Sequence, residues 1–250
     1  MDASAEPAPI PFDTAALQSL EAILSAPQGI DIGEFLATLD EHFARQRSLI
    51  DVQAYREGRK PWKKLADEVV PVAAFLRHVG ITGQVRFPLN DQPPDAWVRE
   101  ASSEAEVGIE VTRVLARSKV ETARSLQDKP VVPGFLGLSD KASPEAYKQA
   151  KKRGRILNSR RGIERAIEGS ITERLAGKSA PKFQGQKLLL VTPLGSAPDH
   201  DWEPLCERLQ PVAKGTAFDQ IFLVGEASSS PPVLLFDRTA QDVVPASAEP

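Results

Sequence analysis

The 250-residue chain is 41% hydrophobic and 26% charged, which is typical of a globular protein. No apolar run approaches the length of a membrane span, and the acidic, proline-rich N-terminus resembles neither a signal peptide nor a transit peptide. The single cysteine, Cys206, excludes an internal disulfide and a structural cysteine–zinc site, and its simplest interpretation is a small buried apolar residue. We therefore expect a cytoplasmic protein that does not associate with membranes.

The net charge of −3 conceals a basic middle region. Residues 113–190 carry 18 Lys and Arg against 7 Asp and Glu, a net charge of +11, whereas the chain on either side is acidic. Such a segment favours a polyanionic partner, and nucleic acid is the natural candidate. A solvated, lysine-rich mobile loop is an equally weighted alternative, because clustering in sequence is not clustering in space.

The N-terminal part of the chain is predicted to be helical. Residues 1–12 form an expected disordered tail, followed by a helical segment over residues 13–60. In this segment Asp13 can cap a helix through about Leu24, and a second helix is expected over residues 32–52. A third helix, residues 62–79, should be kinked or divided by Pro71. The N-terminal helices would form either an appendage or the first layer of the core.

An α/β domain is predicted over residues 61–238, before a disordered tail at 239–250. Three short strands, 84–89, 95–101 and 107–114, suggest an antiparallel meander. Helix 113–126 leads to a basic insertion or loop, 127–160, and then to helix 161–175. The apolar run 187–193 is typical of a central strand with both faces buried. Helix 202–213 and strands 220–224 and 233–236 complete a mixed β-sheet flanked by helices.

Two carboxylates in the meander are the first candidates for chemistry. Asp95 begins the second strand, and Glu110 interrupts an apolar third strand in which Ile109 and Val111 would face the opposite side. Paired carboxylates suit Mg²⁺, which takes oxygen ligands and can promote hydrolysis of a phosphodiester. The alternative is an amphipathic strand with Glu110 and Thr112 on its solvated face.

These elements resemble the restriction-endonuclease-like, PD-(D/E)XK nuclease superfamily. The matching residues are Pro94-Asp95 and Glu110-Val111-Thr112, and the later helix GIERAIEGSITERLA with the runs KLLLVTP and FDQIFLV is similar as well. The resemblance covers about residues 62–236, and the order of elements contributes more than the short motifs. It implies a restriction-endonuclease-like fold and an endonuclease that depends on Mg²⁺ or Mn²⁺.

The resemblance also implies a role for each matching position. Asp95 and Glu110 would be metal ligands, with the main-chain carbonyl of Val111 as a third and Glu68 as a further acidic ligand, although Glu68 is more simply an exposed helix position. Thr112 stands where the family usually has lysine, and threonine cannot supply positive charge. A cation from elsewhere would have to replace it, with Lys187 preferred among the nearest candidates, which are Arg113, Arg117, Lys119 and Lys187.

The basic region would bind the substrate backbone. The expected phosphate contacts are Arg113, Arg117, Lys119, Arg153, Arg155, Arg160, Arg161 and Lys187. Glu164 and Glu168, four residues apart on one helix, are expected to pair with Arg160, Arg161 or Arg165. The run Asp199-His200-Asp201 is interpreted as a surface loop rather than a metal site.

Three functions remain open from the sequence. The leading hypothesis is a metal-dependent nuclease that hydrolyses DNA rather than RNA. The second is a catalytically inactive protein of the same fold that binds nucleic acid or another protein. The third is an interaction module in which the N-terminal helices contact a partner protein or a second copy of the chain.

Overall fold

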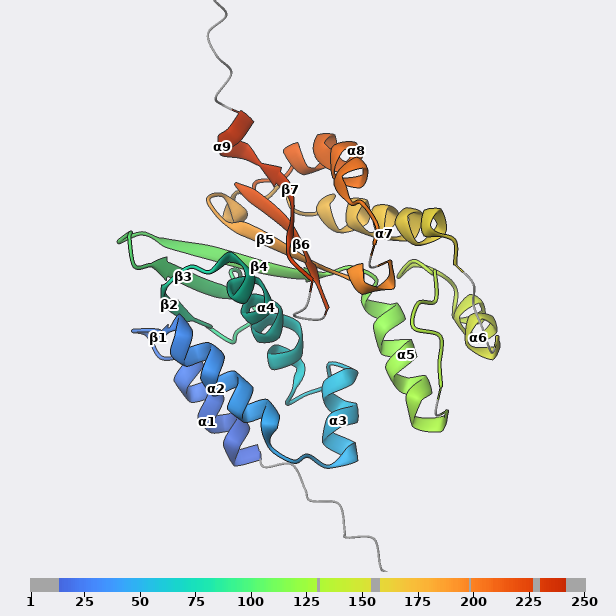
Figure 1. Ribbon diagram of the computed structural model, residues 1–250, viewed down its shortest axis with the longest axis horizontal. Coiled ribbons are helices and arrows are strands. Elements are labelled where there is room, and N and C mark those ends of the chain that lie inside the picture. Colours follow the sequence, from blue (N-terminus) through green and yellow to red (C-terminus); the bar gives the residue numbers. More distant parts are fainter. Residues whose placement is uncertain (1–13, 130, 154–157, 198, 227–229, 242–250) are drawn as a thin grey trace, which may run out of the picture.

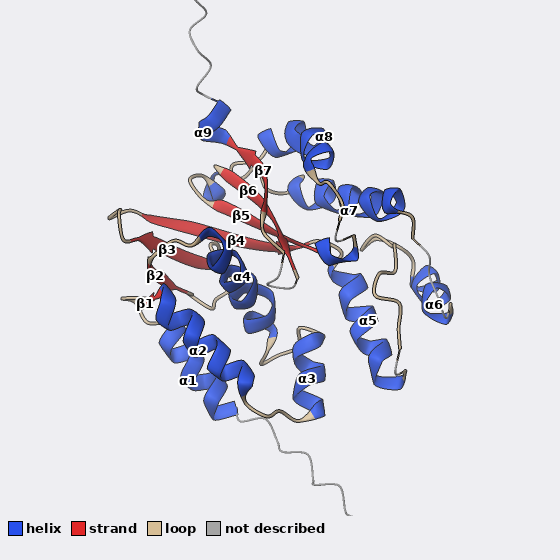
Figure 2. Ribbon diagram, viewed as in Figure 1, coloured by secondary structure: helices blue, strands red, loops and turns tan. Residues whose placement is uncertain are grey.

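The computed structural model describes residues 14–129, 131–153, 158–197, 199–226 and 230–241. Its centre is a seven-stranded mixed sheet in which the strands lie side by side in chain order, β1 to β7 (Figure 1). Helices cover both faces of this sheet (Figure 2). The expected α/β class with a mixed, helix-flanked sheet is therefore confirmed.

The sheet changes from antiparallel to parallel at its middle strand. The antiparallel half contains β1 (Ile30–Asp31), β2 (Gly83–Arg86), β3 (Ala96–Glu100) and β4 (Glu106–Arg113). β5 (Lys187–Thr192) and β6 (Gln220–Gly225) continue in parallel from β4, and β7 (Val233–Asp237) closes the edge antiparallel to β6. The expected meander is β2–β3–β4, while the two-residue strand β1 was not predicted from the sequence.

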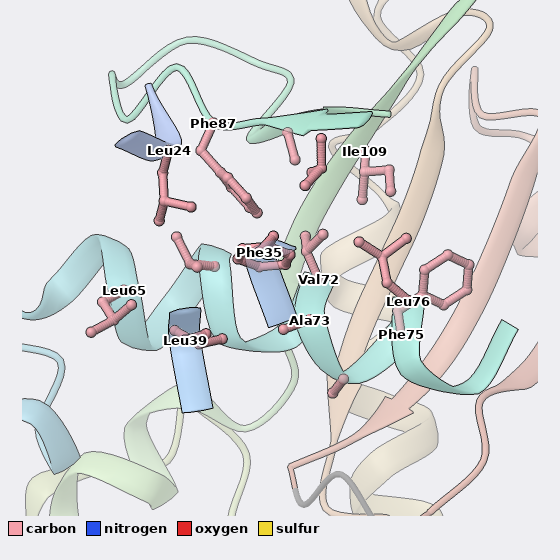
Figure 3. Packing of buried hydrophobic residues seen from close by; sticks show 14 of the residues in the cluster. Leu24, Phe35, Leu39, Leu65, Val72, Ala73, Phe75, Leu76, Phe87 and Ile109 are labelled. Carbon is pink, nitrogen blue, oxygen red and sulfur yellow. The ribbon is translucent and has the colours of Figure 1, made fainter. Parts of the chain in front are cut away.

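One face of the sheet is covered by N-terminal helices. These are α1 (Thr14–Leu24), α2 (Ile32–Ala44) and α4 (Val70–Val79). Phe35, Val72 and Ile109 belong to one buried cluster that joins these helices to the strands (Figure 3). Each fully buried side chain of this size contributes roughly 1.5–3 kcal/mol. The N-terminal helices thus share a core with the sheet.

The other face is covered by α7 (Arg160–Leu175) and α8 (Glu203–Lys214). Ile163, Ile167, Ile171 and Leu175 recur every four residues and are all buried against the sheet. In β5, Leu188 and Leu190 belong to this second cluster and Leu189 belongs to the first. The prediction of a central strand with both faces buried is confirmed.

Two long predicted helices differ from expectation, and one of them is divided. Residues 32–52 form α2 and a separate α3 (Leu49–Arg56), because Arg45 is extended and the Ser48 hydroxyl accepts from the Asp51 N–H, which starts a new helix. Residues 62–79 comprise a π-helical turn, η1 (Leu65–Val69), followed by α4, with Pro71 at the first turn of α4. The backbone stays right-handed helical through Val69 and Val70, so the two parts are continuous and the chain is not divided at Pro71. The proposed cap Asp13 lies outside the described residues.

The segment after β4 contains more structure than expected. Helix α5 (Ala116–Asp128) leads to α6 (Pro144–Lys152), which was not predicted, and Leu136, Tyr147 and Ala150 form a small third cluster. Short helices η2 (Pro181–Phe183) and η3 (Leu194–Ser196) flank β5. Helix α9 (Arg238–Gln241) includes the first three residues of the expected C-terminal tail. Among the described residues, no helix is both long and apolar enough to cross a membrane.

Candidate active site

The strand register brings Asp95 and Glu110 together. Ala96, the first residue of β3, pairs with Ile109, so Asp95 lies opposite Glu110 one step further along. The Val111 N–H donates a 2.8 Å hydrogen bond to Asp95 Oδ2. Gly108 makes the approach possible, because an added Cβ would lie 3.0 Å from the Pro94 ring and 2.9 Å from the Gln186 side chain.

The residues of β4 alternate between the two faces as expected. Ile109 and Val111 pack with the first cluster, whereas Glu110 and Thr112 are in register with Leu188 and Leu190 of the second. Thr112 is half-buried and lies beside Glu110 on the same face. The Glu110 side chain is only 13% exposed, so this face of β4 is not an ordinary solvent-exposed strand face at Glu110.

Glu68 approaches from the π-helical turn η1. It is partly buried, and Lys64 Nζ lies 2.7 Å from its Oε1 atom. Lys64 also donates to the main-chain oxygen of Asn90 at 2.6 Å and lies 3.1 Å from Asp91. One lysine thus links η1 to the loop that precedes Asp95. Burial raises the pKa of Glu68, and Lys64 opposes that rise.

The three acids are close enough to affect one another. Burial, followed by the negative charges of Glu110 and Glu68, raises the pKa of Asp95 to about 7. The hydrogen bond from Val111 and the charge of Lys64 act in the opposite direction. An acid that titrates near neutrality inside a cleft marks a candidate functional site.

Lys178 places a cation against Glu110. It follows α7, and its Nζ lies 2.7 Å from Glu110 Oε1 and 4.6 Å from the centre of the Phe183 ring. Its main-chain N–H donates to Leu175, and its carbonyl accepts from Ala217, so the backbone is held on both sides. Sequence reasoning missed Lys178, because no spacing rule links it to a strand 68 residues away.

Lys187, the preferred sequence-based candidate for a cation beside Glu110, lies elsewhere. Lys187 is in register with Ile109, on the opposite face of the sheet from Glu110, so the preference for Lys187 was wrong. Arg113 does point away from Thr112, as expected: it donates to the Ala66 carbonyl at 3.1 Å and to Glu226 at 2.9 Å. Its guanidinium joins η1 to the end of β6.

These acids and Lys178 line a cleft of about 860 Å³. The strands contribute Asp95, Glu110 and Thr112 to its lining, and much of the rest comes from α3, η1, α5 and the end of α7. The cations among the lining residues are Arg56, Lys63, Arg113, Arg117, Lys119, Arg124, Arg174 and Lys178, and four further acids line it as well, Glu57, Asp67, Glu121 and Glu173. Some of these charges pair with each other, as Lys63 does with Asp67 and Arg124 with Glu57. A cleft with cations close to an acid pair can hold a phosphate ester through its charged oxygens.

The predicted phosphate contacts divide into two groups. Arg113, Arg117 and Lys119 line the cleft. The Arg117 guanidinium donates to the carbonyls of Asp140 and Ala142 and lies over the Tyr147 ring, and burial lowers the pKa of Lys119 to about 8. The other described candidates, Arg153, Arg160, Arg161 and Lys187, are not cleft residues. Arg155 lies outside the described residues.

Carboxylate oxygens that lack hydrogen-bond partners make this site suitable for a cation. Within the described parts of the chain, the buried Oε2 atoms of Glu110 and Glu68 have no hydrogen-bond partner. A buried carboxylate oxygen without a partner is costly, and a divalent cation would remove that cost. The Val111 carbonyl lies on the same edge of β4 as its N–H, and so on the Asp95 side.

No cluster of three or more His, Cys, Asp or Glu side chains suited to a metal occurs among the described residues. The site therefore offers Mg²⁺ or Mn²⁺ two adjacent carboxylates and a carbonyl, with Glu68 as a more distant charge. Mg²⁺ commonly binds through one or two carboxylates and keeps several waters, so this donor set suits it.

Three other sequence predictions have clear outcomes. Glu164 and Glu168 pair with Arg208 of α8 rather than with Arg160, Arg161 or Arg165, because α8 packs beside α7. His200 lies 3.5 Å from Glu164 and against Trp202, in a turn as expected. Cys206 is free and buried, and burial raises its pKa to about 11.

Comparison with protein-family models, curated proteins and solved structures finds no match for this chain.

Proposed function

We propose that this protein is a metal-dependent nuclease with a restriction-endonuclease-like fold, and that it hydrolyses phosphodiester bonds of DNA. The observation that carries the proposal is the Asp95–Glu110 pair, side by side in a cleft lined by charges of both signs, with Lys178 against Glu110. An ordinary structural ion pair would not need a second acid whose pKa burial and like charges raise to about 7.

Asp95 and Glu110 would hold Mg²⁺ or Mn²⁺, together with the Val111 carbonyl. The bound ion would supply positive charge that polarises the phosphate and lowers the pKa of a water molecule. Hydrolysis joins the water oxygen to phosphorus and breaks one P–O ester bond, and the departing sugar oxygen takes up a proton. The negative charge that develops on the phosphate is where fixed cations help most.

Lys178 and Thr112 would share the role that one lysine has in the resembling family. The Lys178 ammonium lies beside Glu110 and supplies fixed positive charge near the phosphate. The Thr112 hydroxyl, on the same face as Glu110, can orient the attacking water through a hydrogen bond. Lys178 comes from the segment after α7 and not from β4, so the positive charge and the hydroxyl beside Glu110 come from different parts of the chain.

A non-cleaving nucleic-acid-binding protein is the second candidate. The observation that favours it is the 2.7 Å contact between Lys178 and Glu110, which already neutralises one of the two carboxylates. This candidate predicts salt-sensitive binding without a divalent ion and no cleavage with any metal.

The test is cleavage of supercoiled plasmid, linear duplex, single-stranded DNA and RNA with Mg²⁺, Mn²⁺ or EDTA. We expect metal-dependent cleavage by the intact protein and at least about 10²-fold slower cleavage by Asp95→Asn and Glu110→Gln. The matched control is Glu164→Gln, which changes a carboxylate paired with Arg208 outside the cleft. Equal cleavage by all four proteins, or none by any, would overturn the proposal.

A further inference from the structure

A second cavity adjoins the acidic cleft, which is the cleft lined by Asp95 and Glu110, at the carboxyl ends of the three parallel strands. Leu115 follows β4, Pro193 follows β5 and Glu226 follows β6, and all three line a chamber of about 240 Å³. Open α/β sheets commonly bind ligands at this end of their parallel strands. Figure 1 shows α3 and α5 side by side at this end of the sheet.

The wall of the chamber is mainly apolar. Leu115, Ala123, Phe135 and Leu136 contribute to it, and three of these side chains are buried. Phe135 is half-buried and presents the aromatic ring of this wall. Sites for drug-sized ligands are roughly 300–1,000 Å³, so this smaller chamber suits a single flat ring system.

Three charged residues line the chamber. Arg56, Lys119 and Glu226 supply donors and an acceptor, and Arg56 and Lys119 also line the acidic cleft. The two cavities therefore share two cationic lining residues, which mark the junction between them. A phosphate held at that junction would lie between the acids and the apolar wall.

Lys119 is poised to gain from an anion at the junction. Burial and the positive charge of Arg113 together lower the pKa of Lys119 to about 8, whereas the negative charges of Glu226 and Asp67 oppose this change. A phosphate would favour the charged ammonium, because an opposite charge within a few ångströms stabilises it. A chamber with an apolar body, an aromatic wall and a cationic mouth matches a nucleobase joined to its own phosphate.

We infer that the chamber takes up one unstacked nucleobase of a single-stranded nucleic acid. The phosphate of the same nucleotide would lie between Arg56 and Lys119. The inference rests on the proposed function, because it supplies the substrate class for the same cleft. It requires the base to leave its neighbours, so single-stranded or locally opened DNA is the expected substrate form.

Gly134 provides a way to fill the chamber without disturbing the fold. It lines the chamber, and an added Cβ would meet no atom within 4 Å. Gly134→Trp should therefore occupy the space intended for the base. Gly169→Trp is the matched control, since Gly169 on α7 also has open space around it and lies outside both cavities.

The experiment measures binding of two labelled single strands by fluorescence anisotropy in EDTA, so that neither is cleaved. One strand carries its bases, and the other has the same phosphates with stable abasic residues throughout. We expect the intact protein and Gly169→Trp to bind the base-bearing strand at least roughly fivefold more tightly. Gly134→Trp should lose this preference and retain its melting temperature, and Phe135→Leu should reduce the preference.

Each other outcome counts against the inference. Equal binding of the two strands by the intact protein, or an unchanged preference in Gly134→Trp, would overturn the inference and leave the nuclease proposal standing. Free deoxynucleoside monophosphates that compete as well as the strand would show a mononucleotide site instead. Binding to neither strand would overturn the inference, whereas the nuclease proposal fails on the cleavage assay.

Discussion

Two pairs of carboxylates in this protein have opposite surroundings. Glu164 and Glu168 on α7 share the Arg208 guanidinium, which contacts both of them. Asp95 and Glu110 have one close cation, Lys178, which contacts only Glu110 Oε1. In the described residues, Glu110 Oε2 is buried and accepts no hydrogen bond.

The two pairs differ less in solvent exposure than in how far nearby cations neutralise their negative charge. The Glu164 side chain is 16% exposed and that of Glu110 is 13% exposed, so both are withdrawn from solvent. In the strand pair, burial first and then the negative charges of Glu110 and Glu68 raise the pKa of Asp95 to about 7. Local rules are commonly broken at functional sites, where a ligand completes the missing interactions.

The largest expected effect concerns stability at alkaline pH. The folded pKa of Asp95, about 7, lies above its ordinary value of 3.8. Its stabilising contribution is therefore complete below about pH 4 and is lost as pH rises to about 7. Asp95→Asn should stabilise the metal-free protein at pH 8 by up to about 4 kcal/mol, and by less than half of that at pH 5.

Denaturant unfolding in EDTA at the two pH values measures this gain. Asparagine can still accept the hydrogen bond from Val111, so the substitution removes charge with little change of shape. Glu164→Gln should show no comparable gain, because Arg208 already compensates that carboxylate. A gain that is equal at pH 5 and pH 8 would refute the raised pKa.

The second effect concerns the rate of cleavage. Lys178→Met should lower kcat by roughly 10²–10³-fold with a small change in KM, because its charge matters most when negative charge develops on the phosphate. Lys182→Met is the matched control, since Lys182 lies over the same Phe183 ring but outside the cleft. Lys187→Met should also cleave normally. Similar kcat values for the Lys178 and Lys182 variants would remove Lys178 from the reaction.

The third effect is on stability, and it compares the packing around a glycine near each pair of carboxylates. Gly108→Ala should destabilise the protein by about 1–3 kcal/mol, because the new methyl group would press on Pro94 and Gln186 below Asp95. Gly169→Ala, next to Glu168, should stabilise it by up to about 1 kcal/mol, since it meets no atom and favours the helix. Thermal unfolding of both variants tests the contrast. A neutral Gly108→Ala would mean that the Pro94 loop can move away.

The strand elements of the site were predictable from local sequence. Alternation along β4 predicts that Glu110 and Ile109 face opposite sides, and the turn between β3 and β4 predicts that Asp95 lies near Glu110. The strict spacing from Ile163 to Leu175 predicts the helix that covers the sheet. These patterns are governed by residues close together in the chain.

The contacts between distant segments were not predictable in this way. Lys178 reaches Glu110, and Arg208 reaches Glu168, only after α7 and α8 have packed on the sheet. Local spacing instead suggested Lys187 for the first contact and neighbours on α7 for the second. Long charged side chains can pair with whatever tertiary packing brings near, so sequence proximity is a weak guide to them.

The smallest expected effect is at the pair on α7 that Arg208 compensates. Glu168→Gln should lower Tm by no more than roughly 2–4 °C, because salt bridges near the surface contribute little. That difference should shrink further in 1 M salt, where the screening length is about 3 Å. Cleavage should be unchanged, since Glu168 lies outside the cleft. Melting curves at low and high salt measure the effect. A large loss of stability that persists in 1 M salt would contradict the expectation that this salt bridge contributes little to folding.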